Sequence, residues 1–162
     1  MIDIQPFSPE YTDGVVSVIL PIQQQEFDIP ITISDQPDIL AIPGFYQKGQ
    51  GNFWVALSGS EVVGTIGLLD IGNSQGALRK MFVKAAYRGK EYGVAQRLLD
   101  GLRNWCVEQG MREVFLGTTA KYLAAHRFYE KNGFVEIAKT ELPASFPVMA
   151  VDSKFYKCIP GA

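Results

Sequence analysis

Apolar and polar positions alternate at several places in the first half of the chain, and this pattern predicts strands. Ile2 to Phe7 ("IDIQPF") is one short alternating run, and Phe53–Leu57 and Val62–Leu69 are two longer runs rich in β-formers. Ser58-Gly59-Ser60 joins the two longer runs, which is typical of a hairpin. Ala77–Val83 then supplies a third consecutive antiparallel strand.

Helical spacing replaces this alternation in the second half of the chain. A helix is predicted after residue 93 and stops at Gly110, with one apolar face made by Val94, Ala95, Leu98, Leu99, Leu102 and Cys106. Arg112–Thr118 follows as a short buried strand. Lys121–Lys131 is predicted as a second helix, and Gly133 suits the left-handed turn after it.

Prolines shape the remaining N-terminal part. A helix is expected from Ser8 or Pro9 towards Leu20, with Pro21 interrupting it. From Pro21 to Gln50 the pattern is irregular and broken by further prolines. Long segments of this kind inside compact domains are often functional lids, so we expect a lid here.

Two final strands, Phe134–Thr140 and Pro147–Lys157, complete the predicted element order. This order indicates an α/β (α+β) fold, with a mixed, mostly antiparallel sheet of about seven strands and helices on both faces. No repeat or change in composition marks a linker, so residues 1–162 are predicted to form a single domain.

Composition narrows the classes of partner. Apolar residues make up 47% and charged residues 20%, and the net charge of −2 gives no reason to expect nucleic acid or an anionic membrane. The N-terminus lacks the pattern of a signal peptide, and no apolar stretch approaches the length of a membrane span. These features predict a cytoplasmic protein. Cys106 and Cys158 match no metal-ligand spacing, and we expect no metal.

The segment "AAYRGKEYGVAQRLLDGLRNW" (residues 85–105) carries the clearest chemistry. A helix start exposes unpaired N–H groups and about half a unit of positive charge, and a glycine-containing loop lets such groups converge. Arg88 and Lys90 would add charge-assisted hydrogen bonds of about 1.5–3 kcal/mol each. We therefore predict a cradle for a phosphate or pyrophosphate.

The type of pyrophosphate ligand follows partly by elimination. No Gly-Lys-Ser or Gly-Lys-Thr is present, which excludes a Walker loop. The dinucleotide fingerprint needs a different glycine spacing within a strand-helix-strand unit, whereas this cradle follows three antiparallel strands. Coenzyme A, which also carries a pyrophosphate, remains.

Two segments resemble the GNAT superfamily of N-acetyltransferases. "MFVKAAYRGKEYGVAQRLLDGL" resembles its acyl-CoA signature, in which a strand leads into an Arg/Gln-x-x-Gly-x-Gly/Ala loop and a helix. Arg88 and Gly93 match the ends of that loop, and Glu91 stands where glycine is usual. "AAHRFYEKNGFVEI" resembles a later segment of the family, and the residues in register are Ala125, Tyr129, Glu130, Lys131, Gly133 and Phe134. Tyr122 stands three residues before Ala125, where the family often has asparagine.

The resemblance implies acetyl-CoA as the cosubstrate. The strand at Met81–Val83 should splay away from the one ending near Gly117, so that the pantetheine arm lies between them and pairs with backbone groups. An amine would then attack the thioester directly in a ternary complex. The residues expected to bind the cosubstrate are Met81, Phe82, Val83, Arg88, Gly89, Lys90, Glu91, Tyr92, Gly93, Val94, Ala95, Ala125, Phe128 and Lys131.

Catalytic roles are predicted for Tyr129 and Glu26. Tyr129 should meet the departing sulfur, mainly by a hydrogen bond, because a phenol with a pKa of about 10 is a weaker acid than a thiol near 8.5. A simple core aromatic is the alternative. Glu26 or Asp28 in the lid could act as the base through water, against the alternative of solvated charges. The lone His126 is more typical of surface or packing.

These features predict transfer of an acetyl group from acetyl-CoA to a primary amine of a small-molecule or peptide acceptor. The alternative is a non-catalytic acyl-CoA-binding regulatory module, motivated by Glu91 and Tyr122. Arg79 and Lys80 could hold an acidic acceptor, although a solvated strand face is the simpler interpretation. The identity of the acceptor and the oligomeric state, including a homodimer, stay open.

Overall fold

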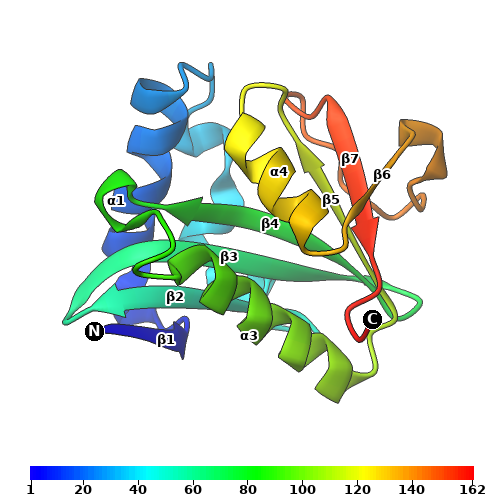
Figure 1. The fold of residues 1–162 in the computed structure, drawn as a ribbon, viewed down its shortest axis with the longest axis horizontal. Helices are drawn as coiled ribbons and strands as arrows, with labels where there is room; N and C mark the ends of the chain where they lie inside the picture. The colour runs from blue at the N-terminus through cyan, green and yellow to red at the C-terminus, as the bar shows by residue number, and fades with distance from the viewer.

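The computed structural model describes all residues 1–162, and its centre is one seven-stranded sheet (Figure 1). The strand order is β1-β2-β3-β4-β5-β7-β6, and only the β4–β5 pair is parallel. This confirms the mixed, mostly antiparallel sheet predicted from the sequence. The strands are β1 (Ile2–Pro6), β2 (Asn52–Ser58), β3 (Glu61–Gly72), β4 (Gln75–Val83), β5 (Glu113–Thr118), β6 (Val135–Ile137) and β7 (Lys154–Cys158).

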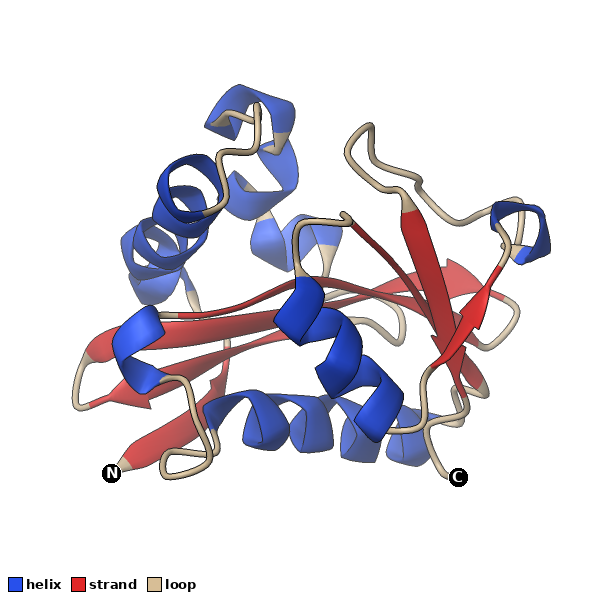
Figure 2. Cartoon of the chain, turned by 45° about the horizontal axis from the view of Figure 1, so that its top comes forward, coloured by secondary structure: helices blue, strands red, loops and turns tan.

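Helices cover both faces of the sheet (Figure 2). One face packs against α1 and the short helices that follow it, and the other packs against α3 and α4. No helix combines the length and the apolar character that crossing a membrane requires. The helices are η1 (Pro9–Tyr11), α1 (Thr12–Pro21), η2 (Ile22–Glu26), η3 (Ile33–Asp35), η4 (Pro37–Leu40), α2 (Ile42–Phe45), η5 (Ala85–Tyr87), α3 (Val94–Gln109), α4 (Leu123–Lys131) and η6 (Lys139–Glu141).

Helix α3 follows its predicted pattern closely. All its predicted core positions except Ala95 are fully buried, and Gly110 ends it in the left-handed conformation at φ 75°. Cys106 and Cys158 are both buried, Cys106 within this helix and Cys158 on β7. Their thiols are therefore core groups, as Cys106 was expected to be.

Pro21 does not interrupt its helix, contrary to the sequence-based expectation. It is the last residue of α1, and the chain continues as the π-helical turn η2, in which Phe27 N–H donates to Ile22 O at 3.1 Å. Pro21 lacks only its own N–H, whose bond would run back to Ser17 O, so the residues after it can continue the helical turn. The helix therefore carries the lid as far as Glu26.

The predicted strands near the C-terminus are too long. Pro147–Ser153 forms a loop, and only Lys154–Cys158 pairs as β7. The Asp152 carboxylate accepts the Met149 N–H at 2.9 Å, and Asp152 N–H donates to Met149 O at 3.0 Å. These local bonds compete with strand pairing and fold the segment into a turn. The strand β6 is likewise confined to Val135–Ile137.

Strands β4 and β5 part in the middle of the sheet. They pair only through Gln75–Ala77 and Glu113–Phe115, while β5 continues alongside β7 to Thr118. Just past this point β4 contains a bulge at Lys80, which has φ 56° and whose carbonyl accepts Thr65 Oγ1–H at 2.7 Å. A bulge leaves a residue without a ladder partner and bends its strand. The result is the V-shaped opening that the resemblance implies.

Candidate active site

The start of α3 is built as an open anion cradle. Gly93 occupies the N-cap in the left-handed conformation at φ 60°, Gly89 lies at φ 109°, and no side chain caps the helix. The Arg97 N–H donates to Gly93 O at 2.9 Å, so the amides before it have no partner within the helix. Both glycines allow backbone conformations that other residues adopt only with strain.

A cavity of about 710 Å³ lies over this helix start, and we call it the cradle cavity. Four cationic side chains line it: Arg88 and Lys90 from the loop, and Arg127 and Lys131 from α4. Arg127 was not predicted, although its i, i+4 spacing to Lys131 places both on one helix face. Its lining is Val83, Tyr87, Arg88, Gly89, Lys90, Gly93, Val94, Ala95, Gln96, Ala124, Arg127, Phe128, Lys131 and Asn132.

A second cavity, of about 260 Å³, continues from the first, and we call it the apolar cavity. Five lining residues belong to both, so the two form one cleft that runs from the cationic cradle inward to β4. Only one of its lining residues, Arg88, carries a charge. The apolar cavity is lined by Ile22, Phe27, Met81, Phe82, Val83, Arg88, Ala95, Tyr122, Ala124, Ala125, Phe128 and Tyr129.

This cleft collects most of the residues predicted to bind the cosubstrate. Only Glu91 and Tyr92 lie outside its lining: Glu91 is exposed, and the ring of Tyr92 packs on that of Tyr87 at 5.3 Å. Both sit in the turn closed by the bond from Gly93 N–H to Gly89 O at 3.3 Å. The unusual glutamate therefore does not occupy the space over the cradle.

Tyr129 lines the apolar cavity from α4 and is also a core residue. Its ring packs against Tyr156 at 5.9 Å and Phe134 at 5.4 Å, and it is only 6% exposed. Burial, with the nearby hydroxyls of Tyr122 and Tyr156, raises its pKa well above the usual range. The phenol therefore stays protonated and available as a hydrogen-bond donor into the cavity.

Tyr122 and two phenylalanines form an aromatic group at the edge of the apolar cavity. The Tyr122 ring meets Phe27 edge-on at 4.8 Å and Phe82 at 6.0 Å. Phe27 follows the lid helix, so this contact joins the lid to α4 and β4. The hydrophobic pattern alone did not predict this group, because its members come from three separate elements.

Glu26 lies against the cradle. Its carboxylate accepts two hydrogen bonds from the Arg88 guanidinium, at 2.5 and 2.7 Å, while Arg88 Nε–H donates to Val83 O at 2.8 Å. The hydrogen bond from Arg88 lowers the pKa of Glu26. A carboxylate with a lowered pKa is a weaker base, so this geometry does not favour the predicted base role. A second contact holds the lid, because the ammonium of Lys121 donates a hydrogen bond to Asp28 O at 2.9 Å.

His126 is a packing residue, one of the two ordinary interpretations of a lone helical histidine. It is buried, and its Nε2 lies 3.0 Å from Thr119 O. This contact ties the loop after β5 to α4. His126 lines neither cavity of the cleft.

A third cavity, of about 90 Å³, meets the cleft at Phe82, and we call it the Arg79 cavity. It follows the unpaired part of β4 and ends at Gly117 on β5 and at the loop before β7. Its lining is Gln23, Ile31, Leu78, Arg79, Lys80, Phe82, Gly117, Phe146, Pro147, Met149, Val151 and Asp152. Of these, Asp152 was missed by sequence reasoning.

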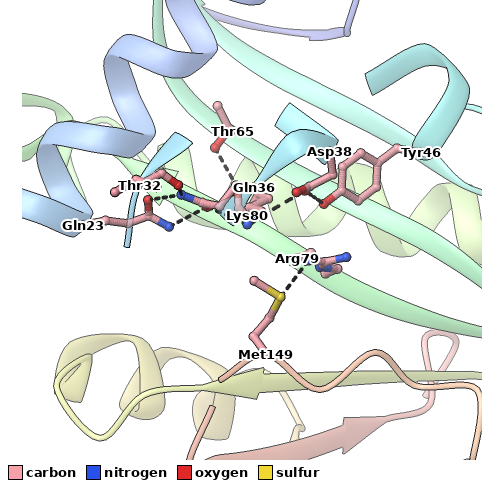
Figure 3. A network of polar contacts seen from close by, with 9 residues as sticks. All are labelled: Gln23, Thr32, Gln36, Asp38, Tyr46, Thr65, Arg79, Lys80 and Met149. Carbon is pink, nitrogen blue, oxygen red and sulfur yellow. Dashed lines mark hydrogen bonds and ion pairs between the residues drawn. The ribbon is translucent and has the colours of Figure 1, made fainter. Parts of the chain in front are cut away.

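Lys80 is not on a solvated strand face, which corrects the simpler interpretation of the sequence. Its side chain is 6% exposed, and its ammonium donates to Gln36 Oε1 at 2.7 Å and lies 3.8 Å from Asp38 (Figure 3). Burial lowers the pKa of Lys80 to about 8, against the opposing charge of Asp38. Tyr46 donates to the same Asp38 at 2.5 Å. The bulge at Lys80 places it within the lid's polar network instead of in water.

An open cationic helix start, two strands that part and an apolar cavity between them are the features of an acyl-CoA-dependent acyltransferase. The sequence profile described as the Acetyltransferase (GNAT) family matches residues 18–134, and this chain belongs to that family. The family predicted from the two segments is thereby confirmed. Acetyl-CoA-dependent N-acetyl transfer is supported at the level of the family.

Two solved structures resemble the whole chain. An acetyltransferase of the GNAT family from Staphylococcus aureus Mu50 is 39% identical, covers 99% of each chain and superposes with a TM-score of 0.95. An acetyltransferase from Streptococcus agalactiae 2603 is 29% identical, covers 98% of each chain and has a TM-score of 0.92. N-acetylaspartate synthetase from Danio rerio is 35% identical over 106 residues, which are 64% of this chain. The match spans 37% of that relative's length.

Proposed function

We propose that this protein transfers the acetyl group of acetyl-CoA to a primary amine, by direct attack within a ternary complex. The observation that carries the proposal is the continuous cleft from the α3 cradle to the parting of β4 and β5. Its two ends complement those of acetyl-CoA, since the cationic end suits the anionic pyrophosphate and the apolar end suits the acyl-pantetheine arm. Family membership supports the same reaction.

The cradle is proposed to hold the pyrophosphate. The free amides at the start of α3 would donate to its oxygens, and Arg88, Lys90, Arg127 and Lys131 would balance its charge. The apolar cavity would take the pantetheine arm against Met81–Val83, where β4 has lost its partner strand. This arrangement would bring the thioester to Tyr129 and Phe82.

Each bond made and broken in the proposed reaction can be assigned to groups in the cleft. The neutral amine forms a bond to the thioester carbonyl carbon, and the carbon–sulfur bond then breaks. Tyr129 would donate a hydrogen bond to the departing thiolate, and backbone donors near the β4 bulge would stabilise the oxyanion. The proton that the nitrogen loses as the amide forms would pass to the thiolate, so that CoA leaves as its thiol. Glu26, the base predicted from the sequence, is paired with Arg88.

The amine nature of the acceptor draws on the relatives, one of which is named as an N-acetylaspartate synthetase. We propose a cytoplasmic enzyme, as the sequence features predict. The chain spans less than two fifths of that relative's length.

Thiol release from acetyl-CoA with a panel of amines tests the reaction, and calorimetry with CoA tests the cleft. We expect CoA to bind with micromolar affinity and at least one amine to accelerate thiol release. Lys131→Met, which removes one cradle cation, should weaken CoA binding, whereas Lys48→Met, remote from the cleft lining, should not. CoA binding with no turnover on any amine would support the regulatory module instead.

A further inference from the structure

We propose that the Arg79 cavity binds a small acceptor that carries both an amine and a carboxylate, with Arg79 holding the carboxylate and Asp152 the ammonium group. This inference rests on the acetyl transfer proposed above and names its substrate class. Two opposite charges, Arg79 and Asp152, share this cavity without forming an ion pair.

Arg79 carries a partly buried guanidinium that lacks an anionic partner. No carboxylate lies within 4.0 Å of it, and its one side-chain hydrogen bond goes to Met149 Sδ at 3.2 Å (Figure 3). A thioether is a weak acceptor, and a guanidinium has five N–H donors to satisfy. Its plane also lies against the rings of Phe45 and Tyr46, at 5.6 and 6.0 Å. The fork of donors is therefore positioned but unpaired.

The chemistry of this group favours a carboxylate ligand. A guanidinium binds a carboxylate through two parallel hydrogen bonds, and such a pair is stronger when it is partly withdrawn from water. The aromatic rings restrain the side chain, which reduces the entropy lost on binding. Lys80 cannot take this role, because its ammonium is already engaged by Gln36 and Asp38.

Asp152 supplies the opposite charge from the other side of the parting strands. A side chain at Gly117 would approach Asp152 Oδ2 to 2.6 Å, so the carboxylate rests on β5 where it leaves β4. It accepts the Met149 N–H at 2.9 Å and has no cation within 4.0 Å. Its pKa is raised by burial, against the Met149 bond and the charges of Arg79 and Lys80. A raised pKa favours proton acceptance by this carboxylate, whereas the Arg88 bond lowers the pKa of Glu26.

The Arg79 cavity adjoins the end of the cleft where the thioester is proposed to lie. Phe82 lines both the Arg79 cavity and the apolar cavity, so an amine held at Asp152 would lie beside the thioester end of the cleft. Asp152 would take one proton from the ammonium, and the neutral amine would then attack the thioester carbon. As the carbon–sulfur bond breaks, the second proton of the nitrogen would pass to the thiolate, so that CoA leaves as its thiol. The cavity volume of about 90 Å³ fits a small molecule. Gln23 closes the cavity from the lid, held by reciprocal bonds of 2.9 and 2.8 Å to Gln36.

The first experiment compares acceptors on the unaltered protein. Thiol release is measured with the L-amino acids and ω-amino acids, each beside the derivative in which every carboxylate is converted to an amide and the amine is kept. We expect at least one amino acid to exceed its amide by tenfold or more in kcat/KM. Equal use of amides would overturn this inference and leave the acetyl transfer standing. No thiol release with any amine would overturn the transfer itself and this inference with it.

The second experiment changes the two charged residues. Arg79→Met should raise the KM for the preferred amino acid roughly 10- to 150-fold, the range for one lost charge-assisted bond, and leave the KM for acetyl-CoA unchanged. Arg79→Lys should give an intermediate value. Arg112→Met serves as the control, because Arg112 is exposed, directly precedes β5 and lines none of the three cavities. An unchanged acceptor KM in Arg79→Met would overturn the assignment; if that variant does not fold, the amide comparison decides.

Asp152→Asn tests the ammonium end separately. It should lower kcat by about 100-fold and flatten the low-pH limb of the kcat profile, since an amide cannot accept the proton. The groups facing Asp152 are Arg79 and Lys80, both retained in this variant. A kcat and a pH profile equal to those of the unaltered protein would show that Asp152 has no such role.

Discussion

The carboxylate of Glu26 and the guanidinium of Arg88 are joined by two hydrogen bonds across a sequence separation of 62 residues. The pair fastens the end of the lid helix to the loop that cradles the predicted pyrophosphate. The Nε–H of Arg88 donates to Val83 O and orients the side chain, while its two terminal nitrogens donate to Glu26 of the lid. A phosphate that approaches the cradle must compete with Glu26 for them.

Glu26→Gln should consequently tighten CoA binding. The pair is 37% exposed on each side chain, so the competing interaction is worth about 0.2–1 kcal/mol, or up to roughly fivefold in Kd. Calorimetry with CoA measures the change. Glu61→Gln, which breaks the surface pair with Lys84 away from the cleft, should leave the Kd unchanged.

The same variant decides the predicted base role of Glu26. Loss of a general base lowers kcat by about 10²–10⁴-fold, whereas loss of the Arg88 pair alone should change kcat by less than about threefold. We expect the smaller change, because Arg88 lowers the pKa of Glu26. A large fall in kcat with CoA affinity retained would restore Glu26 as the base.

Tyr129→Phe should lower kcat and preserve CoA affinity. The variant keeps the ring packing against Phe134 and Tyr156 and removes only the hydroxyl. A hydrogen bond to a developing thiolate is worth about 1.5–3 kcal/mol, which corresponds to a loss of roughly 10- to 150-fold. Single-turnover thiol release measures it, with the KM for acetyl-CoA as the internal control. Unaltered turnover would show that Tyr129 is only a core aromatic.

Gly93→Ala should weaken CoA binding through the backbone alone. Nothing lies within 4 Å of a Cβ at this position, but φ is 60°, which costs a residue other than glycine about 1–2 kcal/mol. Gly59→Ala is a matched control, because it also has open space, at φ 62°, in the turn between β2 and β3. Both variants should lose similar stability in denaturant, and only Gly93→Ala should lose CoA affinity. Equal affinities would contradict the cradle.

The sequence predicted those parts of the site that are local in the chain. The apolar face of α3, the glycines of the cradle and the hairpin of β2 and β3 are patterns among residues close in the chain, so a single sequence shows them. The contacts of Glu26 with Arg88 and the placement of Asp152 beside Gly117 depend on how the lid and the β7 loop fold back. Lone acidic residues have no periodicity, so their partners could not be predicted.

The bulge at Lys80 is the clearest case of a side chain placed against its pattern. Strand alternation assigns Arg79 and Lys80 to opposite faces, yet both line the Arg79 cavity. The left-handed conformation at φ 56° turns Lys80 out of the regular alternation and into the lid's network. Such a conformation is uncommon for a residue other than glycine, asparagine or aspartate, and the sequence carries no signal for it.

The lowered pKa of Lys80 predicts that stability rises with pH above about 8. Burial lowers this pKa from 10.5 to about 8, so between these values the unfolded chain binds more protons than the folded one. Stability then increases with pH across that window, by up to about 3 kcal/mol for this one group. Denaturant unfolding at pH 7.5, 8.5 and 9.5 should be compared with Lys80→Met, which removes the titrating group. Burial raises the pKa of the Cys106 and Cys158 thiols, which act in the opposite sense, but they do so in both proteins. The difference between the two proteins therefore isolates the contribution of Lys80. Lys84→Met, which removes a lysine at the surface, should keep the rise of stability with pH seen in the unaltered protein. If stability changes with pH equally in all three proteins, Lys80 titrates as it does in water.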